Sequence, residues 1–148
     1  MPVKTTSQTK LLLAGTWKHS IYEQACADAL NKLGVKVIPL EWGSNFPGII
    51  GRLEERYVVP YKNTTRLNNK LLQTIHLEKP DIVFIWRGTH IYPQTINAIR
   101  KSAKAKIISY NNDSPFRPLY KNSKSLHERR MWKMYMNAIL KLDTESGY

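Results

Sequence analysis

Four short loops carry most of the side chains in this sequence that could do chemistry. They span residues 15–19, 43–47, 87–92 and 111–118, and each follows a short apolar run of the kind that forms a buried strand. Parallel strands end at one edge of a sheet, where open α/β proteins usually bind ligands. We therefore expect the loops to form one site. The candidate residues are Gly15, Thr16, Trp17, Lys18, His19, Arg87, Thr89, His90, Asn111, Asn112, Asp113 and Arg117.

Two of these residues are candidates for a catalytic base. His19 could remove a proton because the ordinary pKa of histidine is near neutrality, although an exposed loop histidine would look the same in sequence. Asp113 could act as a base, accept hydrogen bonds from sugar hydroxyls, or cap the turn that begins at Ser114. No second carboxylate stands at a spacing typical of a metal pair or of the acid pair of glycoside hydrolases.

The other polar residues favour binding roles and exclude some cofactors. The guanidinium of Arg87 suits phosphate or carboxylate recognition, with a surface ion pair as the alternative. His90 is either a substrate contact or an ordinary loop histidine. The first loop has one glycine, Gly15, and then bulky Trp17, so close approach to a pyrophosphate is disfavoured. The sequence also lacks the glycine-rich phosphate loop of nucleoside triphosphatases.

The apolar pattern predicts an alternation of strands and helices. Strands are expected at 10–16, 35–42, 81–86 and 106–110. Ser20 and Glu23 match a capping box at the start of the first helix, which Gly34 ends. The buried stripe of that helix is predicted to include Ile21, Ala25, Ala29 and Leu33, with Tyr22 and Cys26 alongside. Pro39 removes one ladder donor, which predicts an edge position or a late bend for the second strand.

Four more helices are expected after the second strand. Ile49, Ile50, Leu53 and Tyr57 predict one, and the leucines between 67 and 72 with Ile75 predict the next. Pro93 suits the first turn of a third helix. The last helix has an apolar stripe that could cover the sheet, dock on a partner or join the core. That stripe comprises Trp132, Tyr135, Met136, Ile139 and Leu140.

Composition sets the broad class. The 148 residues predict one domain at 10–125, preceded by a polar tail at 1–9 and followed by a helix and tail at 126–148. Cys26 is the single cysteine, so an internal disulfide and a cysteine-based zinc site are excluded. No run of about 20 apolar residues predicts a membrane span, and residues 1–10 lack an apolar signal core, which favours the cytoplasm. The net charge of +12 favours polyanionic partners.

Several segments together resemble one family. The resemblance rests on the apolar strand and glycine at 11–15, the helix end at 29–34, and the segments at 66–72, 79–85, 87–88, 93–96 and 111–116. In this order and spacing they resemble the N-terminal half of bacterial glycosyltransferases of the GT-B fold, of the spore-maturation type. The resemblance covers about residues 10–116.

This resemblance implies a Rossmann-like α/β fold, a parallel sheet flanked by helices, that forms half of a GT-B enzyme. The half would shape the acceptor side and transfer a sugar from a nucleotide sugar to an acceptor hydroxyl, without a metal or bound cofactor. His19 or Asp113 would be the base, and Arg87 would contact phosphate or acceptor. The donor-binding half would follow Tyr148 or come from a partner chain. The alternative is a non-catalytic basic module that binds a polyanion, such as nucleic acid, or a partner protein.

Overall fold

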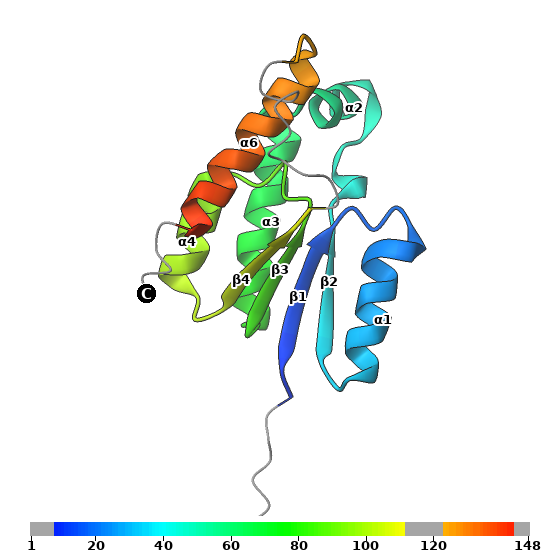
Figure 1. Ribbon diagram of the computed structural model, residues 1–148, viewed down its shortest axis with the longest axis vertical. Helices are drawn as coiled ribbons and strands as arrows, with labels where there is room; N and C mark the ends of the chain where they lie inside the picture. The colour runs from blue at the N-terminus through cyan, green and yellow to red at the C-terminus, as the bar shows by residue number, and fades with distance from the viewer. Residues whose placement is uncertain (1–7, 112–122, 144–148) are drawn as a thin grey trace, which may run out of the picture.

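A four-stranded parallel sheet flanked by helices forms the centre of the computed structural model (Figure 1). The structure describes residues 8–111 and 123–143. The strands are β1 (Lys10–Gly15), β2 (Lys36–Glu41), β3 (Ile82–Trp86) and β4 (Lys106–Tyr110). The predicted α/β, Rossmann-like fold class is confirmed.

The strand order is β2-β1-β3-β4. Pro39 pairs with Leu13 of β1, and β2 is an edge strand, as the missing ladder donor of proline predicts. On the other side of β1, Ala14 pairs with Ile85. The chain reverses its direction of travel across the sheet after β2, so the ends of β1 and β3 lie side by side. Such a switch point is where open α/β sheets bind ligands.

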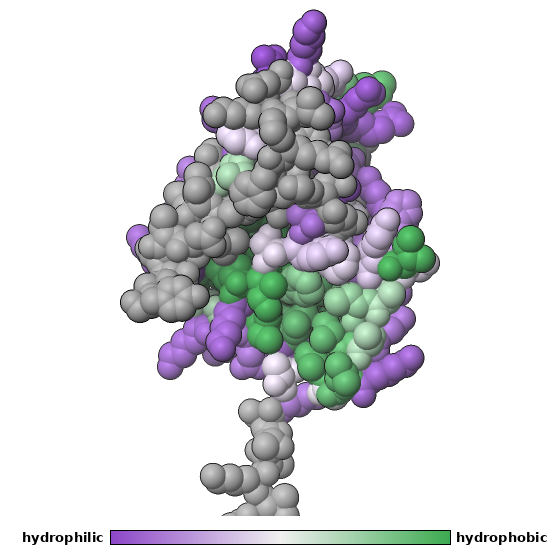
Figure 2. Space-filling view, viewed as in Figure 1, coloured by the Kyte–Doolittle hydropathy of each residue, from purple (hydrophilic) through white to green (hydrophobic). Residues whose placement is uncertain are grey.

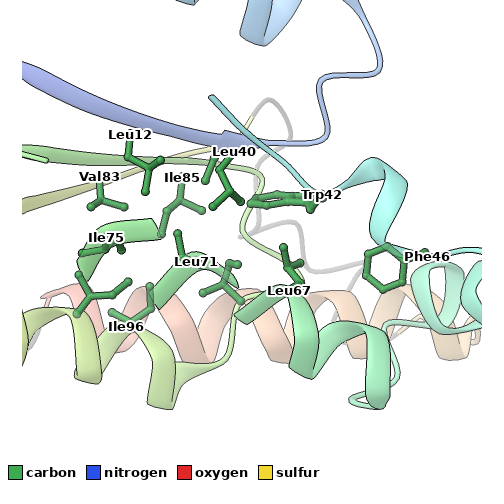
Figure 3. Close-up of a cluster of buried hydrophobic side chains, with 13 residues drawn as sticks. Leu12, Leu40, Trp42, Phe46, Leu67, Leu71, Ile75, Val83, Ile85 and Ile96 are labelled. Atoms are coloured by element: carbon green, nitrogen blue, oxygen red, sulfur yellow. The ribbon is translucent and has the colours of Figure 1, made fainter. Parts of the chain in front are cut away.

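Helices connect the strands and enclose the core. The helical elements are η1 (Ser20–Gln24), α1 (Ala25–Lys32), η2 (Gly43–Asn45), α2 (Gly48–Tyr57), α3 (Lys62–Glu78), α4 (Pro93–Ser102) and α6 (Leu126–Asp143). The main core lies between one face of the sheet and helices α3 and α4. Leu12 and Ile85 of the sheet meet Leu71 of α3 and Ile96 of α4 there, and all four are almost completely buried (Figure 3).

The last helix joins the helical layer. Helix α6 packs against α4 and α2 and does not cover the sheet (Figure 1). Trp132 and Met136 are half-buried there, whereas the side chains of Tyr135, Ile139 and Leu140 lie outside the described residues. The helix thus packs onto its neighbours, and the role of its apolar stripe stays a prediction, because most of the stripe's side chains lie outside the described residues.

The first helix differs from its prediction. Ile21 and Leu33 are 72% and 79% exposed, whereas Ala27 is buried, so the predicted apolar stripe is wrong. The helix begins with the π-helical turn η1, and its inward side instead carries Glu23 and Ala27, with Cys26 and Leu30 half-buried beside them. The capping box is also wrong, because the Glu23 carboxylate bonds to the loop before the helix. Gly34 ends the helix with a positive φ of 82°, as expected.

The second face of the sheet is covered by α1 over β1 and β2. Leu11 and Leu13 pack there against Ala27, with Cys26 half-buried beside them. Partial burial raises the pKa of the Cys26 thiol. Further along the sheet, Ile108 and Tyr110 of β4 are each 46% exposed. Figure 2 shows apolar side chains gathered over the strands and α1 on this face.

Candidate functional site

The loop after β1 is held by an acid from the first helical turn. Glu23 is 2% exposed, and its Oε1 accepts hydrogen bonds from the backbone N–H of Thr16 at 2.9 Å and of Trp17 at 3.2 Å. The Thr16 hydroxyl donates to the same oxygen at 3.3 Å. Gly15 is required beneath this carboxylate, because a Cβ there would lie 2.5 Å from the Glu23 Oε1.

This arrangement fills the position that a phosphate would take in a dinucleotide-binding loop. In such loops, backbone N–H groups next to the first helix bind the pyrophosphate. Here the N–H groups of Thr16 and Trp17 already bind a carboxylate of the protein itself. A phosphate could use them only by displacing the Glu23 carboxylate, so anion binding by this loop is disfavoured.

The loops after β1 and β2 are in contact. The Trp42 backbone N–H donates to the Gly15 carbonyl at 3.0 Å. A Cβ on Gly43 would lie 2.8 Å from the Thr16 carbonyl oxygen, so the two loops approach as closely as glycine allows. Lys18 forms an ion pair with Glu55 of α2 at 2.8 Å. These contacts place the first two candidate loops and α2 in one assembly.

The loop after β3 begins with an unusual backbone. Arg87 has a φ of 53° and Trp17 a φ of 54°, although both are bulky residues. Non-glycine residues adopt this left-handed region infrequently, and such residues cluster at functional sites. The Arg87 N–H donates to the Tyr110 carbonyl at 2.8 Å, and the Thr89 N–H donates to the Arg87 carbonyl at 2.7 Å. Arg87, whose side chain is exposed, is thus fixed at the ends of β3 and β4.

His90 is part of the framework of this loop. It is 8% exposed and lies against the Phe46 ring, with the ring centroids 5.1 Å apart. Its Nε2–H donates to the Glu55 carbonyl at 3.1 Å, and its Nδ1 accepts from the Thr89 hydroxyl at 3.1 Å. Burial lowers the pKa of His90, so the neutral imidazole is favoured. Both ring nitrogens are therefore occupied within the protein, and so is the Thr89 hydroxyl.

A buried amide attaches the same loop to α3. The Asn68 Nδ2 donates to the Thr64 carbonyl at 2.7 Å and to the His90 carbonyl at 2.9 Å. Its Oδ1 accepts from the Tyr92 N–H at 2.8 Å and from the Thr95 hydroxyl at 2.7 Å. All the hydrogen-bonding capacity of this side chain is used. Asn68 was not among the predicted site residues, because an asparagine within a helical pattern gives no sign of what it will meet.

A second buried acid organises the end of α2. Glu54 is 3% exposed and accepts from the Thr64 N–H at 2.6 Å and hydroxyl at 2.8 Å, and from the Asn63 Nδ2 at 2.8 Å. Burial raises the pKa of this carboxyl, but the hydrogen bonds from Thr64 and Asn63 outweigh burial and the pKa is lowered overall. The carboxylate thereby satisfies N–H groups at the start of α3, which has no side-chain cap of its own.

Rings connect the candidate loops across the sheet edge. The His19 ring meets Tyr22 edge-on at 6.0 Å between centroids, Tyr22 lies 6.4 Å from Trp86, and Trp86 lies 4.7 Å from Tyr110. His19 is exposed, and Tyr22 and Tyr110 are 39% and 46% exposed. The sequence pattern of the loops does not point to Tyr22, Trp86 or Tyr110, because these residues lie within a helical turn and two strands. For Trp86 and Tyr110, the available signal was the strand alternation that places both on the same face of the sheet.

Of the remaining predicted residues, only some lie among those that the structure describes. Asn111 follows β4 directly, next to the end of β3, and is half-buried. Asn112, Asp113 and Arg117 lie outside the described residues. The indole Nε1 of Trp17 is buried and has no hydrogen-bond partner in the part of the chain that the structure describes. Because β1, β3 and β4 are parallel, the described loops after β1 and β3 and Asn111 after β4 lie at the same carboxyl edge of the sheet.

A separate groove with a basic lining runs along the start of α3. It has a volume of about 870 Å³. Lys62, Arg66 and Lys70 line it at four-residue spacing, so their charges lie along one face of the helix. Asn45 and Tyr61 also line this groove. An arrangement of this kind suits an anion with several charges in a row.

Within residues 8–111 and 123–143, no group of three or more histidine, cysteine or acidic side chains could hold a metal ion. Of the helices in the same ranges, none is long and apolar enough to cross a bilayer. Comparisons with known proteins found no matching family model, no similar curated protein and no similar solved structure.

Proposed function

We propose that this chain is the acceptor-side domain of a glycosyltransferase. The observation that carries the proposal is the row of partly exposed rings next to His19 at the carboxyl edge of a parallel sheet. The C–H faces of a sugar ring are apolar and pack well on aromatic rings, while its hydroxyls reach polar groups at the rim. Trp86 and Tyr110 would provide the apolar surface, and His19 would lie at the rim.

The reaction would transfer a sugar from a nucleotide sugar to a hydroxyl. His19, whose imidazole is exposed, would take the proton of the acceptor hydroxyl as its oxygen bonds to the anomeric carbon. The bond from that carbon to the nucleotide phosphate breaks, and the phosphate leaves with the electron pair. Asp113 is the other candidate base. Arg87, fixed at the same edge, would bind the acceptor or the leaving phosphate.

The donor would be held elsewhere. The N–H groups of Thr16 and Trp17 are bound by Glu23, so the loop after β1 offers no phosphate site. The nucleotide sugar would therefore need a second domain or a partner chain. Thr89 and His90 would act through the shape of the loop after β3, since their polar groups bond to one another and to Glu55.

Binding to a glycan array tests the acceptor part of the proposal. We expect the full chain to retain a subset of immobilised oligosaccharides, and Tyr110→Ala to reduce this binding about tenfold, as loss of one stacking ring would. Ile108→Ala is the matched control, because Ile108 lies on the same strand and face and is equally exposed at 46%. Equal loss in both variants, or no glycan bound by the wild-type chain, would contradict the proposal.

The basic groove supports a second candidate function, binding of a polyanion. Neutralising Lys62, Arg66 and Lys70 together should weaken binding of single-stranded nucleic acid. It should also reduce the salt dependence of binding, because a protein that makes fewer phosphate contacts releases fewer counterions. Three exposed lysines elsewhere, Lys36, Lys101 and Lys104, provide the control. Binding that is independent of salt, or equally affected by both triple variants, would rule this function out.

A further inference from the structure

An apolar surface lies at the end of the molecule where α2 meets the start of α6 (Figure 1). Ile49 and Ile50 are 71% and 69% exposed, and Leu53 is 49% exposed, although aliphatic side chains are usually buried. A shallow groove of about 400 Å³ continues the surface onto α6. We call this surface the α2 patch. Its members are Ile49, Ile50, Leu53, Tyr57, Tyr61 and Leu126.

The helical repeat explains why this side of α2 is apolar and outward. Gly51 and Glu54 face the protein and are buried. A Cβ on Gly51 would lie 2.4 Å from the Phe46 carbonyl carbon, so the first turn of α2 packs closely on the segment that leads into the helix. Ile49 and Leu53 stand one turn apart on the outward side. The exposure of the α2 patch is therefore fixed by the packing of the opposite side of the helix.

Positive charge surrounds the α2 patch. Arg52 and Arg56 are exposed on the same helix, and the Arg56 guanidinium lies over the Tyr57 ring at 5.9 Å. Lys62 lies over the Tyr61 ring at 5.8 Å, and Arg130 lines the groove. These contacts keep the cations at the rim of the apolar surface.

The acids that the structure describes beside the α2 patch are bound by other groups. Glu54 is buried and bound by Thr64, Glu55 is paired with Lys18, and Glu128 of α6 accepts from the Ser123 hydroxyl. Within the described residues, this surface thus combines protruding aliphatic side chains and rings with an excess of positive charge. Amphipathic helices that lie in a membrane interface have this combination.

We propose that the α2 patch inserts into the surface of an anionic membrane. The aliphatic side chains of α2 would enter the boundary between headgroups and acyl chains, and the arginines beside them would bind lipid phosphates. A convex helix with protruding isoleucines suits a fluid bilayer better than a protein partner, whose surface would need a matching cavity. This inference is independent of the proposed glycosyltransferase function.

Vesicle co-sedimentation tests the apolar part. The full chain is mixed with vesicles of phosphatidylcholine alone, or with about one quarter of phosphatidylglycerol. We expect binding to the anionic vesicles only, and a loss of roughly tenfold or more for Ile49→Ser with Ile50→Ser. The matched control is Ile21→Ser with Leu77→Ser, which changes two aliphatic side chains of similar exposure, 72% and 77%, elsewhere on the surface. An equal loss in both double variants would overturn the proposal.

The charge part has its own variant pair. Arg52→Gln with Arg56→Gln should weaken binding to anionic vesicles about thirtyfold, since each basic residue at such a surface contributes about fivefold. Lys101→Gln with Lys104→Gln, exposed on and after α4, should have little effect. If the wild-type chain fails to bind anionic vesicles but binds an acidic amphipathic peptide, the membrane is the wrong partner and the proposal fails.

A probe on the chain gives a readout that does not depend on the stability of the serine variants. In a Cys26→Ser background, a polarity-sensitive dye on Ile50→Cys should shift its emission to the blue when anionic vesicles are added. The same dye on Ile21→Cys should not shift. Shifts at both positions, or at neither, would overturn the assignment of the contact to α2.

Discussion

The carboxylate of Glu23 lies directly over Gly15, so closely that a Cβ on the glycine would be 2.5 Å from Oε1 and 2.8 Å from Cγ. This pair sets the geometry of the loop after β1, because the same carboxylate binds the N–H groups of Thr16 and Trp17. The acid and the glycine require each other, which gives a direct test.

Gly15→Ala should lower the free energy of unfolding by about 1–3 kcal/mol, because the added methyl group overpacks a buried position. Urea denaturation of the full chain measures the change. The double variant Gly15→Ala with Glu23→Ala should cost less than the sum of the two single changes, since the clash is gone once Glu23 is truncated. Strict additivity would show that Glu23 does not lie over Gly15.

Asn68→Ala should lower the free energy of unfolding by about 2–4 kcal/mol, because it leaves several buried partners without a hydrogen bond. The neighbouring Asn69 is exposed and provides the control, with an expected change within about 0.5 kcal/mol. Thermal and urea unfolding of the two variants make the comparison. Similar stabilities would contradict the role given to Asn68.

The free energy of unfolding should fall as the pH is lowered, over a range set by the pKa of His90. Its pKa is lowered in the folded protein, so the unfolded chain binds a proton more readily and protonation favours unfolding. The stabilisation is complete above the ordinary value of 6.5 and is lost as the pH falls from there toward the folded pKa. His90→Gln should reduce the slope of stability against pH in this window, as measured by unfolding at a series of pH values. An unchanged slope would exclude His90 as its source.

Glu54 should act at lower pH. Its pKa is also lowered, so its stabilisation is present above the ordinary value of 4.5 and is lost as the pH falls through the folded value. At neutral pH, Glu54→Gln should lower the free energy of unfolding by about 1.5–3 kcal/mol, because charge-assisted bonds to Thr64 become ordinary ones. The difference between variant and wild type should shrink below pH 4.5. A difference that is constant with pH would contradict this assignment.

The strands could be predicted because each is a short apolar run, and Pro39 marked an edge strand because of its chemistry. The inward face of the first helix could not, since the sequence offers two faces at helical spacing, and the buried one carries Glu23 and Ala27 instead of Ile21. Glu23 fits a capping box by spacing, and only the backbone path shows that its carboxylate turns back to the loop. Asn68 and Tyr22 needed long-range contacts, which no local pattern contains.

Glu55 connects the loops at the carboxyl edge of the sheet to the outward face of α2. Its carboxylate holds Lys18 in the loop after β1, and its carbonyl accepts from His90 in the loop after β3. Since Glu55 is itself part of α2, these contacts fix the position of the outward face of that helix relative to the carboxyl edge of the sheet. A molecule resting on a bilayer through α2 would carry that edge at a constant distance from the lipid plane. Its encounter with an acceptor anchored in the same plane would become a search in two dimensions.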